Sequence, residues 1–206
     1  MYYVLMVLAG VIAGNILNIY ISRKVLSGDI LEDYKSCFLK DASYYLIQFF
    51  MVAMYMLIYK KAADINELVR FCLYSAFMFA VVIEDFNEKK ISNKLIVAFA
   101  IIGLITDMFM HTTNALIGII IMVLLVGGVF GIIYRTSRGG IGAGDVKLLA
   151  CSALFLGPGE LFTTIIIAVL FTFLTGIVLV AMRRMEKKSL VPFSPFVLAG
   201  FLFSIL

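Results

Sequence analysis

Eight apolar segments, most of them close to the length of a membrane-spanning helix, fill almost the whole chain. A bilayer core about 30 Å thick needs about 20 apolar residues per helical span. The chain is 63% hydrophobic, whereas an average globular protein is about 45–50% apolar. This excess is too large for one soluble core, so the sequence predicts an all-α polytopic membrane protein with about eight transmembrane helices.

The predicted spans form one membrane-embedded domain over residues 1–206, with a polar loop at 22–41. They are Tyr2–Ile21, Ala42–Tyr59, Leu68–Ile83, Leu95–Met110, Ala115–Tyr134, Val146–Leu156, Leu161–Met182 and Pro192–Leu206.

The placement of basic residues favours an orientation with the N-terminus outside. Fourteen of the 17 Lys and Arg residues then lie in inner loops, and only Lys60, Lys61 and Arg70 lie outside. This distribution follows the positive-inside rule. It also accounts for the net charge of +4 through topology and contact with the lipid bilayer, so we expect no nucleic-acid partner.

Two aspartates stand beside these apolar segments. Asp85 lies in Glu84-Asp85-Phe86-Asn87-Glu88-Lys89-Lys90-Ile91-Ser92-Asn93, and Asp145 lies in Gly139-Gly140-Ile141-Gly142-Ala143-Gly144-Asp145-Val146-Lys147. A carboxylate at bilayer depth costs roughly 2.5–3.5 kcal/mol and usually marks function. In the favoured orientation both aspartates fall at the cytoplasmic face.

The sixth apolar segment is unusually short. A helix over Val146–Leu156 would be roughly 17 Å long, well below the thickness of the hydrocarbon core. Gly157-Pro158-Gly159 then ends it. We therefore expect either a re-entrant helix or an Asp145 drawn below the membrane surface, and both arrangements place Asp145 beside an aqueous pocket.

Paired carboxylates can hydrolyse a peptide bond when they share one proton. The ionised member takes a proton from water, and the protonated member polarises the scissile carbonyl. The glycines have a separate predicted task. Gly142 and Gly144 lack Cβ atoms, so a substrate strand could lie along Gly142-Ala143-Gly144 and pair with its main chain.

Simpler interpretations stay open for each residue. Asp145 could serve only as a helix cap, and Asp85 could be only a loop charge; Glu84 is expected to face solvent. At the level of the whole protein, an ion- or proton-coupled transporter could titrate the same two aspartates. A structural subunit of a secretion machine is a third alternative, but it leaves the glycine-rich turn before Asp145 unexplained.

The metal-ligating residue types are sparse. The chain has three cysteines, Cys37, Cys72 and Cys151, without a Cys-x-x-Cys pair, and one histidine, His111, in a predicted outer loop. Cys72 and Cys151 lie in apolar segments, where small packing residues are common. We therefore expect no metal site.

Four motifs in order give the chain a resemblance to type IV prepilin peptidases, the GxGD-type membrane aspartyl peptidases. Gly142-Ala143-Gly144-Asp145-Val146-Lys147 resembles the GxGDxK signature, and Asp85 with Ile91-Ser92-Asn93 resembles D-x5-I-P-N, with Ser92 in place of proline. Asn15–Arg23 is similar to S-F-L-N-V-x-x-x-R. Pro192-Phe193-Ser194-Pro195-Phe196 is similar to P-F-G-P-F, with Ser194 in place of glycine.

The resemblance implies an endopeptidase that removes the short basic leader from type IV pilin-like or pseudopilin precursors at the cytoplasmic membrane face. It makes Asp85 and Asp145 catalytic. We also expect Gly142, Ala143, Gly144 and Lys147 to bind the substrate. Many bacterial members also methylate the new N-terminus, and S-adenosylmethionine is the cofactor expected if that activity is retained. Their first cytoplasmic loop binds zinc through two Cys-x-x-Cys pairs. This chain keeps only Cys37 there, so it cannot supply those four ligands.

Overall fold

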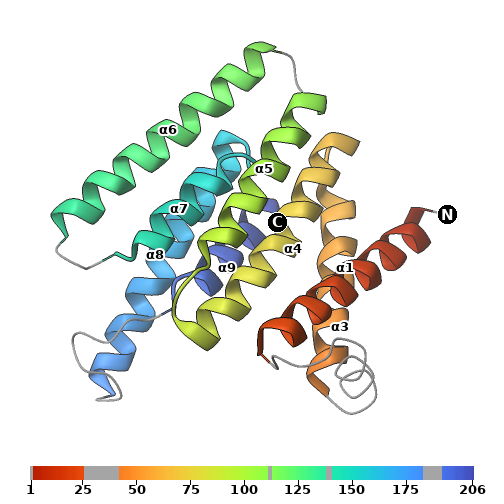
Figure 1. Cartoon of the computed structure of the whole chain (residues 1–206), viewed down its shortest axis with the longest axis horizontal. Helices are drawn as coiled ribbons and strands as arrows, with labels where there is room; N and C mark the ends of the chain where they lie inside the picture. Colours follow the sequence, from red (N-terminus) through yellow and green to blue (C-terminus); the bar gives the residue numbers. More distant parts are fainter. Residues whose placement is uncertain (1, 26–41, 111–112, 138–140, 183–191) are drawn as a thin grey trace. The chain divides into compact units, whose positions relative to one another are not determined.

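The computed structural model describes residues 2–25, 42–110, 113–137, 141–182 and 192–206, and within these ranges it contains eight helices and no strand. Figure 1 shows the helices in chain order. The chain divides into two compact units, residues 1–83 and 84–206. The boundary falls inside helix α4 (Ile65–Glu88), so the last turn of α4 belongs to the second unit.

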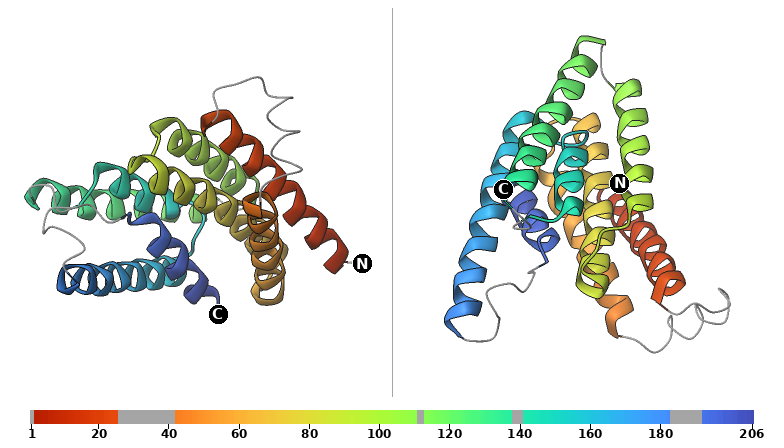
Figure 2. Two further views of the ribbon diagram at one scale, coloured as in Figure 1. Left: turned by 90° about the horizontal axis from the view of Figure 1, so that it is seen from below. Right: turned by 60° about the vertical axis from the view of Figure 1, so that its left-hand side comes forward.

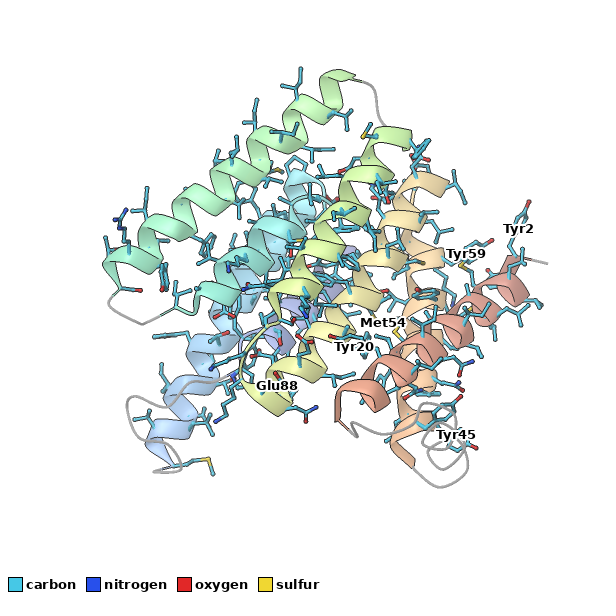
Figure 3. All side chains as sticks on the ribbon, viewed as in Figure 1. Tyr2, Tyr20, Tyr45, Met54, Tyr59 and Glu88 are labelled. Carbon is cyan, nitrogen blue, oxygen red and sulfur yellow. The ribbon has the colours of Figure 1, made fainter. Side chains whose placement is uncertain are left out.

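The first unit is built around the helices α1 (Tyr2–Val25) and α3 (Ala42–Lys61), which pack along one another. Gly10 allows the close approach, since a Cβ there would lie only 2.8 Å from the Cα of Val52. Small residues have this role at many membrane helix interfaces. The rings of Tyr3 and Tyr59 meet edge to face at 5.0 Å. In Figure 3 the labelled Tyr59 lies at the opposite end of α3 from Tyr45.

Polar side chains join the same two helices further along. The Asn15 side-chain oxygen accepts hydrogen bonds from the hydroxyl of Tyr44 and, at 2.6 Å, from the amide of Gln48. The Asn18 amide donates to the backbone oxygen of Tyr44 at 3.4 Å. The N-terminal motif that contains both asparagines therefore stabilises the first unit.

The second unit contains α5 (Asn93–Met110), α6 (Thr113–Thr136), α7 (Ala143–Ser152), α8 (Pro158–Ala181) and α9 (Ser194–Ile205). The short α7 packs against both α5 and α6, and α8 pairs extensively with α9. Figures 1 and 2 show these neighbours side by side. Gly200 lets α9 approach α8, because a Cβ there would overlap the backbone oxygen of Thr164.

Each of the eight predicted apolar segments corresponds to one of these helices, so the all-helical prediction is confirmed for the described residues. Within the part of the chain that the structure describes, four helices are long and apolar enough to cross a membrane: Tyr2–Ile21, Ile65–Glu88, Leu116–Thr136 and Pro158–Ala181. Apolar side chains on α6 and α8 are largely exposed, with Leu124 at 68% and Ile166 at 65%. Such surfaces suit lipid as the solvent.

Two predicted boundaries are corrected. The polar loop expected at 22–41 begins later, because residues 22–25 continue α1; residues 26–41 lie outside the described residues. The sixth helix begins at Ala143 and ends at Ser152, not at Val146 and Leu156. Residues 153–156 instead form buried turns, because the chain must reverse there before Gly157 and Pro158 start α8.

Candidate active site

The last turn of α4 carries Asp85. The backbone oxygen of Asp85 accepts a hydrogen bond from the amide of Lys89 at 3.0 Å, and Lys89 adopts a positive φ of 50°. A residue in this left-handed conformation is a common helix stop. The labelled Glu88 marks the end of α4 in Figure 3. Asp85 therefore lies one turn inside α4, where its side chain is only 6% exposed.

The beginning of α9 holds the Asp85 carboxylate. The Oδ2 atom of Asp85 accepts two hydrogen bonds from Ser194, one from the backbone amide at 3.1 Å and one from the hydroxyl at 2.7 Å. Both residues are buried. Ser194 was not predicted as a site residue, although it replaces the glycine of the P-F-G-P-F motif that this segment resembles.

A backbone amide at the beginning of α7 likewise donates to the Asp145 carboxylate, but here the donor and the acceptor belong to the same helix start. Gly142 is extended, with φ −75° and ψ 142°, and its amide donates to Oδ2 of Asp145 at 3.2 Å. An acidic residue in the first turn also gains from the helix dipole. A Cβ on Gly142 would lie 2.9 Å from that same Oδ2 atom, so the absence of a side chain at Gly142 permits this position of the carboxylate.

Gly142 is the extended residue that precedes α7. Ala143 and Gly144 lie in the first turn of α7, before the predicted start of this helix at Val146. A Cβ on Gly144 would lie 3.4 Å from the Cβ of Ile91, an ordinary packing distance. Gly144 therefore contacts the segment that links α4 to α5, and the substrate-binding role of Gly142, Ala143 and Gly144 stays a prediction.

Further contacts join the Asp85 motif to the Asp145 motif. The ammonium group of Lys147 donates to the side-chain oxygen of Asn93 at 2.8 Å.

Glu84 accepts a hydrogen bond from the backbone amide of Ser92 at 2.9 Å and is only 3% exposed. The expectation that Glu84 faces solvent is therefore wrong. Its carboxylate turns back from α4 to hold the chain that leads into α5.

The electrostatic environment of Asp145 reflects a nearby carboxylate. Asp145 lies outside the four helices that are long enough to span a membrane. Burial, followed by the negative charge of Asp85, raises the pKa of Asp145 from 3.8 to about 6, although the hydrogen bond from Gly142 acts in the opposite direction. The second unit thus places Asp85 close enough to Asp145 for its charge to raise the pKa of Asp145.

The described residues contain no group of three or more His, Cys, Asp or Glu side chains that could hold a metal ion. Cys37 and His111 lie outside the described residues. Three residues with contacts in this region were not predicted as site residues: Ser194, which bonds Asp85; Asn93, which bonds Lys147; and Glu84, which bonds Ser92. Of these residues, Asn93 is the last residue of the Asp85 motif, and this position could have marked it as a site residue.

Comparison with known proteins identifies a related family. Residues 72–180 match the model of the type IV leader peptidase family, Peptidase_A24, and these residues include both aspartates and just over half of the chain. No curated protein and no solved structure matches the chain.

Proposed function

We propose that this chain, which belongs to the type IV leader peptidase family, is a membrane aspartyl endopeptidase acting through Asp85 and Asp145. Its substrates would be type IV pilin-like or pseudopilin precursors, and its product the precursor freed of its basic leader. The observation that carries the proposal is the raised pKa of Asp145 beside the charge of Asp85. Two interacting carboxyls whose ionisations separate can supply one base and one acid.

The reaction needs one ionised and one protonated carboxyl. The carboxylate accepts a proton from water while the water oxygen attacks the scissile carbonyl carbon. The protonated carboxyl donates its proton to the carbonyl oxygen, and a tetrahedral intermediate forms. When this intermediate collapses, the C–N bond breaks and the leaving nitrogen takes the proton that the first carboxyl gained from water. A hydroxyl of the intermediate returns its proton to the second carboxyl, which restores the pair, and the free leader and mature protein result.

The contacts around the pair support this use. Ser194 fixes the orientation of Asp85, and Gly142 fixes that of Asp145. Lys147, held by Asn93, lies two residues beyond Asp145 and would contact the substrate near the aspartates. A rigid arrangement matters because a misplacement of about 1 Å can lower a rate about 10²-fold.

The membrane topology follows from the charge pattern. We propose eight spans with the N-terminus outside and the aspartates at the cytoplasmic face of the cell membrane, where the Lys- and Arg-rich loops face anionic lipid. A cysteine-labelling map with a membrane-impermeant reagent tests the orientation. Labelling of a cysteine placed within residues 89–92 by reagent added from the outside would contradict the proposed orientation.

Peptidase activity is proposed to need no metal or cofactor, because carboxylates and water supply the whole reaction. Methylation of the new N-terminus, if retained, would use S-adenosylmethionine. Transfer of a labelled methyl group from that cofactor to cleaved pilin tests the second activity separately from the first.

The deciding experiment is cleavage of a prepilin with an intact leader by purified protein, read by mass spectrometry. Asp85→Asn and Asp145→Asn should each lose cleavage while the protein stays inserted and folded, because an amide is neither a general base nor an acid. Glu160→Gln, an acidic residue of α8, is the matched control. Near wild-type turnover in either aspartate variant would contradict the proposed pair.

A further inference from the structure

Glu84 is a buried acid that the proposed reaction does not use. Its side chain is 3% exposed, and its Oε2 atom accepts a hydrogen bond from the backbone amide of Ser92 at 2.9 Å. Burial of a carboxylate is costly unless donors face it. We infer that Glu84 is a positioning residue, which fixes the link between α4 and α5 and thereby holds the start of α7, with Asp145, beside Asp85. This inference rests on the proposed function and adds a residue to it.

The contact closes the link between the two helices. α4 ends at Glu88 and α5 begins at Asn93, so residues 89–92 form the link. Glu84 precedes Asp85 on α4, and Ser92 is the last residue of the link. The backbone oxygen of Ser92 also accepts the first hydrogen bond of α5, from the amide of residue 96 at 3.2 Å. The bond between Glu84 and Ser92 therefore ties the part of α4 that carries Asp85 to the beginning of α5.

The same link contacts the start of α7 at two points. A Cβ on Gly144 would lie 3.4 Å from the Cβ of Ile91, and the ammonium group of Lys147 donates to the side-chain oxygen of Asn93 at 2.8 Å. Gly144 and Lys147 lie on either side of Asp145 in the sequence. A displacement of the link would therefore be passed to the turn that carries Asp145, because both contacts would move with it.

The donor in this contact is present because residue 92 is not proline. The D-x5-I-P-N motif that the segment resembles has proline at this position. Proline fixes its own φ but has no amide hydrogen to donate. Serine gives up that restraint, and its amide hydrogen instead has an acceptor in Glu84. The contact between Glu84 and Ser92 thus replaces the proline ring as the device that fixes the link.

Two substitutions at Ser92 separate its amide from its hydroxyl. Ser92→Ala keeps the amide that Glu84 accepts and should keep close to the wild-type kcat for prepilin cleavage. Ser92→Pro removes the amide hydrogen and leaves the buried carboxylate facing a ring that cannot donate. Its kcat per folded molecule should fall about 10-fold, less than the 10²-fold that a displacement of about 1 Å can cause. Equal rates in the two variants would overturn the inference.

Substitutions at Glu84 test the other partner. Glu84→Gln keeps an oxygen that accepts the amide hydrogen and should cleave at close to the wild-type rate, whereas Glu84→Ala should lose about 10-fold in kcat. Residues in direct contact give non-additive effects. The double variant Glu84→Ala/Ser92→Pro should therefore lose no more than either single variant, because proline then restrains the link and no buried carboxylate lacks a donor.

Two outcomes of this cycle would reject the contact. Independent losses would multiply, so a double variant about 10²-fold slower than wild type would show that the two residues act separately. A loss in Glu84→Gln as large as that in Glu84→Ala would show that an acceptor oxygen at this position is not what matters. If Glu84→Ala does not fold, the comparison of Ser92→Ala with Ser92→Pro decides by itself.

Glu67 offers a matched control on the same helix. Its Oε2 atom accepts the backbone amide of Ala63 at 2.6 Å, in the first turn of α4 instead of the last. Glu67→Ala therefore also removes a carboxylate of α4 from a backbone amide, but it leaves the link to α5 untouched and should keep the wild-type kcat. A loss equal to that of Glu84→Ala would attribute the effect to the stability of α4 as a whole.

Hydrogen exchange read by mass spectrometry needs no cleavage. The amide of Ser92 should exchange slowly in wild-type protein and Glu84→Gln and faster in Glu84→Ala. Faster exchange should extend to the amides of Asp145 and Val146, which donate to the backbone oxygen of Gly142 at 3.1 and 3.3 Å. Unchanged exchange at these two amides would overturn the inference. If wild-type protein does not cleave prepilin, the proposed function fails, while this measurement still decides whether the link holds α7.

Discussion

Helices α7 and α8 begin in nearly the same way, yet only α7 carries a catalytic candidate. Each follows an extended glycine, Gly142 with φ −75° and Gly157 with φ −65°, and each has an acid three residues later, Asp145 and Glu160. In both helices the carboxylate turns back to where a Cβ on the glycine would lie. The shared pattern is thus a way to begin a helix, and it does not by itself indicate function.

What distinguishes α7 is the neighbour of its acid. Burial, followed by the charge of Asp85, raises the pKa of Asp145 to about 6. The link between α4 and α5 also rests on α7, through Ile91 against Gly144 and Asn93 against Lys147. The comparison teaches that an acid that caps a helix becomes a candidate proton donor when a second carboxylate is brought beside it.

The largest expected contrast is between the two acids themselves. Asp145→Asn should lower prepilin cleavage by about 10²–10⁴-fold, the usual contribution of a general acid or base, whereas Glu160→Gln should keep close to the wild-type rate. Turnover per folded molecule measures both. Equal losses in the two variants would mean that helix capping, and not proton transfer, is what Asp145 contributes.

The two glycines should differ next. Gly142→Ala places a Cβ 2.9 Å from Oδ2 of Asp145, so the carboxylate must move, and cleavage should fall about 10²-fold with little change in melting temperature. Gly157→Ala displaces the carboxylate of Glu160 in the same way and should affect stability alone. If the specific activities of the two variants match, the local position of the Asp145 carboxylate does not limit the rate.

Gly144 should show a graded effect. A Cβ there meets Ile91 at an ordinary packing distance of 3.4 Å, so Gly144→Ala should be tolerated. Valine adds γ carbons that press on Ile91 or on a bound substrate, and overpacking of this kind costs about 1–3 kcal/mol. Cleavage per folded Gly144→Val molecule should be blocked if substrate docks here. A folded valine variant with the normal rate would leave Gly144 a packing role only.

The smallest expected effect is on stability against pH. The folded-state pKa of Asp145, about 6, exceeds its ordinary value of 3.8. Wild-type protein therefore loses stability as pH rises from about 4 through about 6. Asp145→Asn lacks this loss, so its melting temperature should exceed that of wild type by a few degrees above pH 6 and converge with it near pH 4. Parallel melting curves across this range would show that Asp145 does not titrate as described.

The local pattern of the chain was sufficient for much of the fold. Apolar runs and the need to satisfy backbone hydrogen bonds in lipid require helices, and the structure has a helix at each predicted segment. The two aspartates and the turn at Gly142 were also predicted, because a carboxylate beside an apolar span and a glycine before a helix are local features. The predicted boundaries of α7 were wrong by a few residues, because helix propensity does not determine whether residues at a helix end join the helix or pack as a turn.

Tertiary structure decided how those residues are used. Asp85 and Ser194 are 109 positions apart, and Lys147 and Asn93 are 54 apart, so no local pattern could pair them. Glu84 looked like a solvent-facing neighbour of Asp85, but the turn after α4 brings the amide of Ser92 to it. The sequence by itself determined which groups are present and on which helices they lie. Packing of α7 and α9 determined which donors and which charge surround each aspartate, because hydrogen bonds and pKa shifts depend on distances that only the folded chain defines.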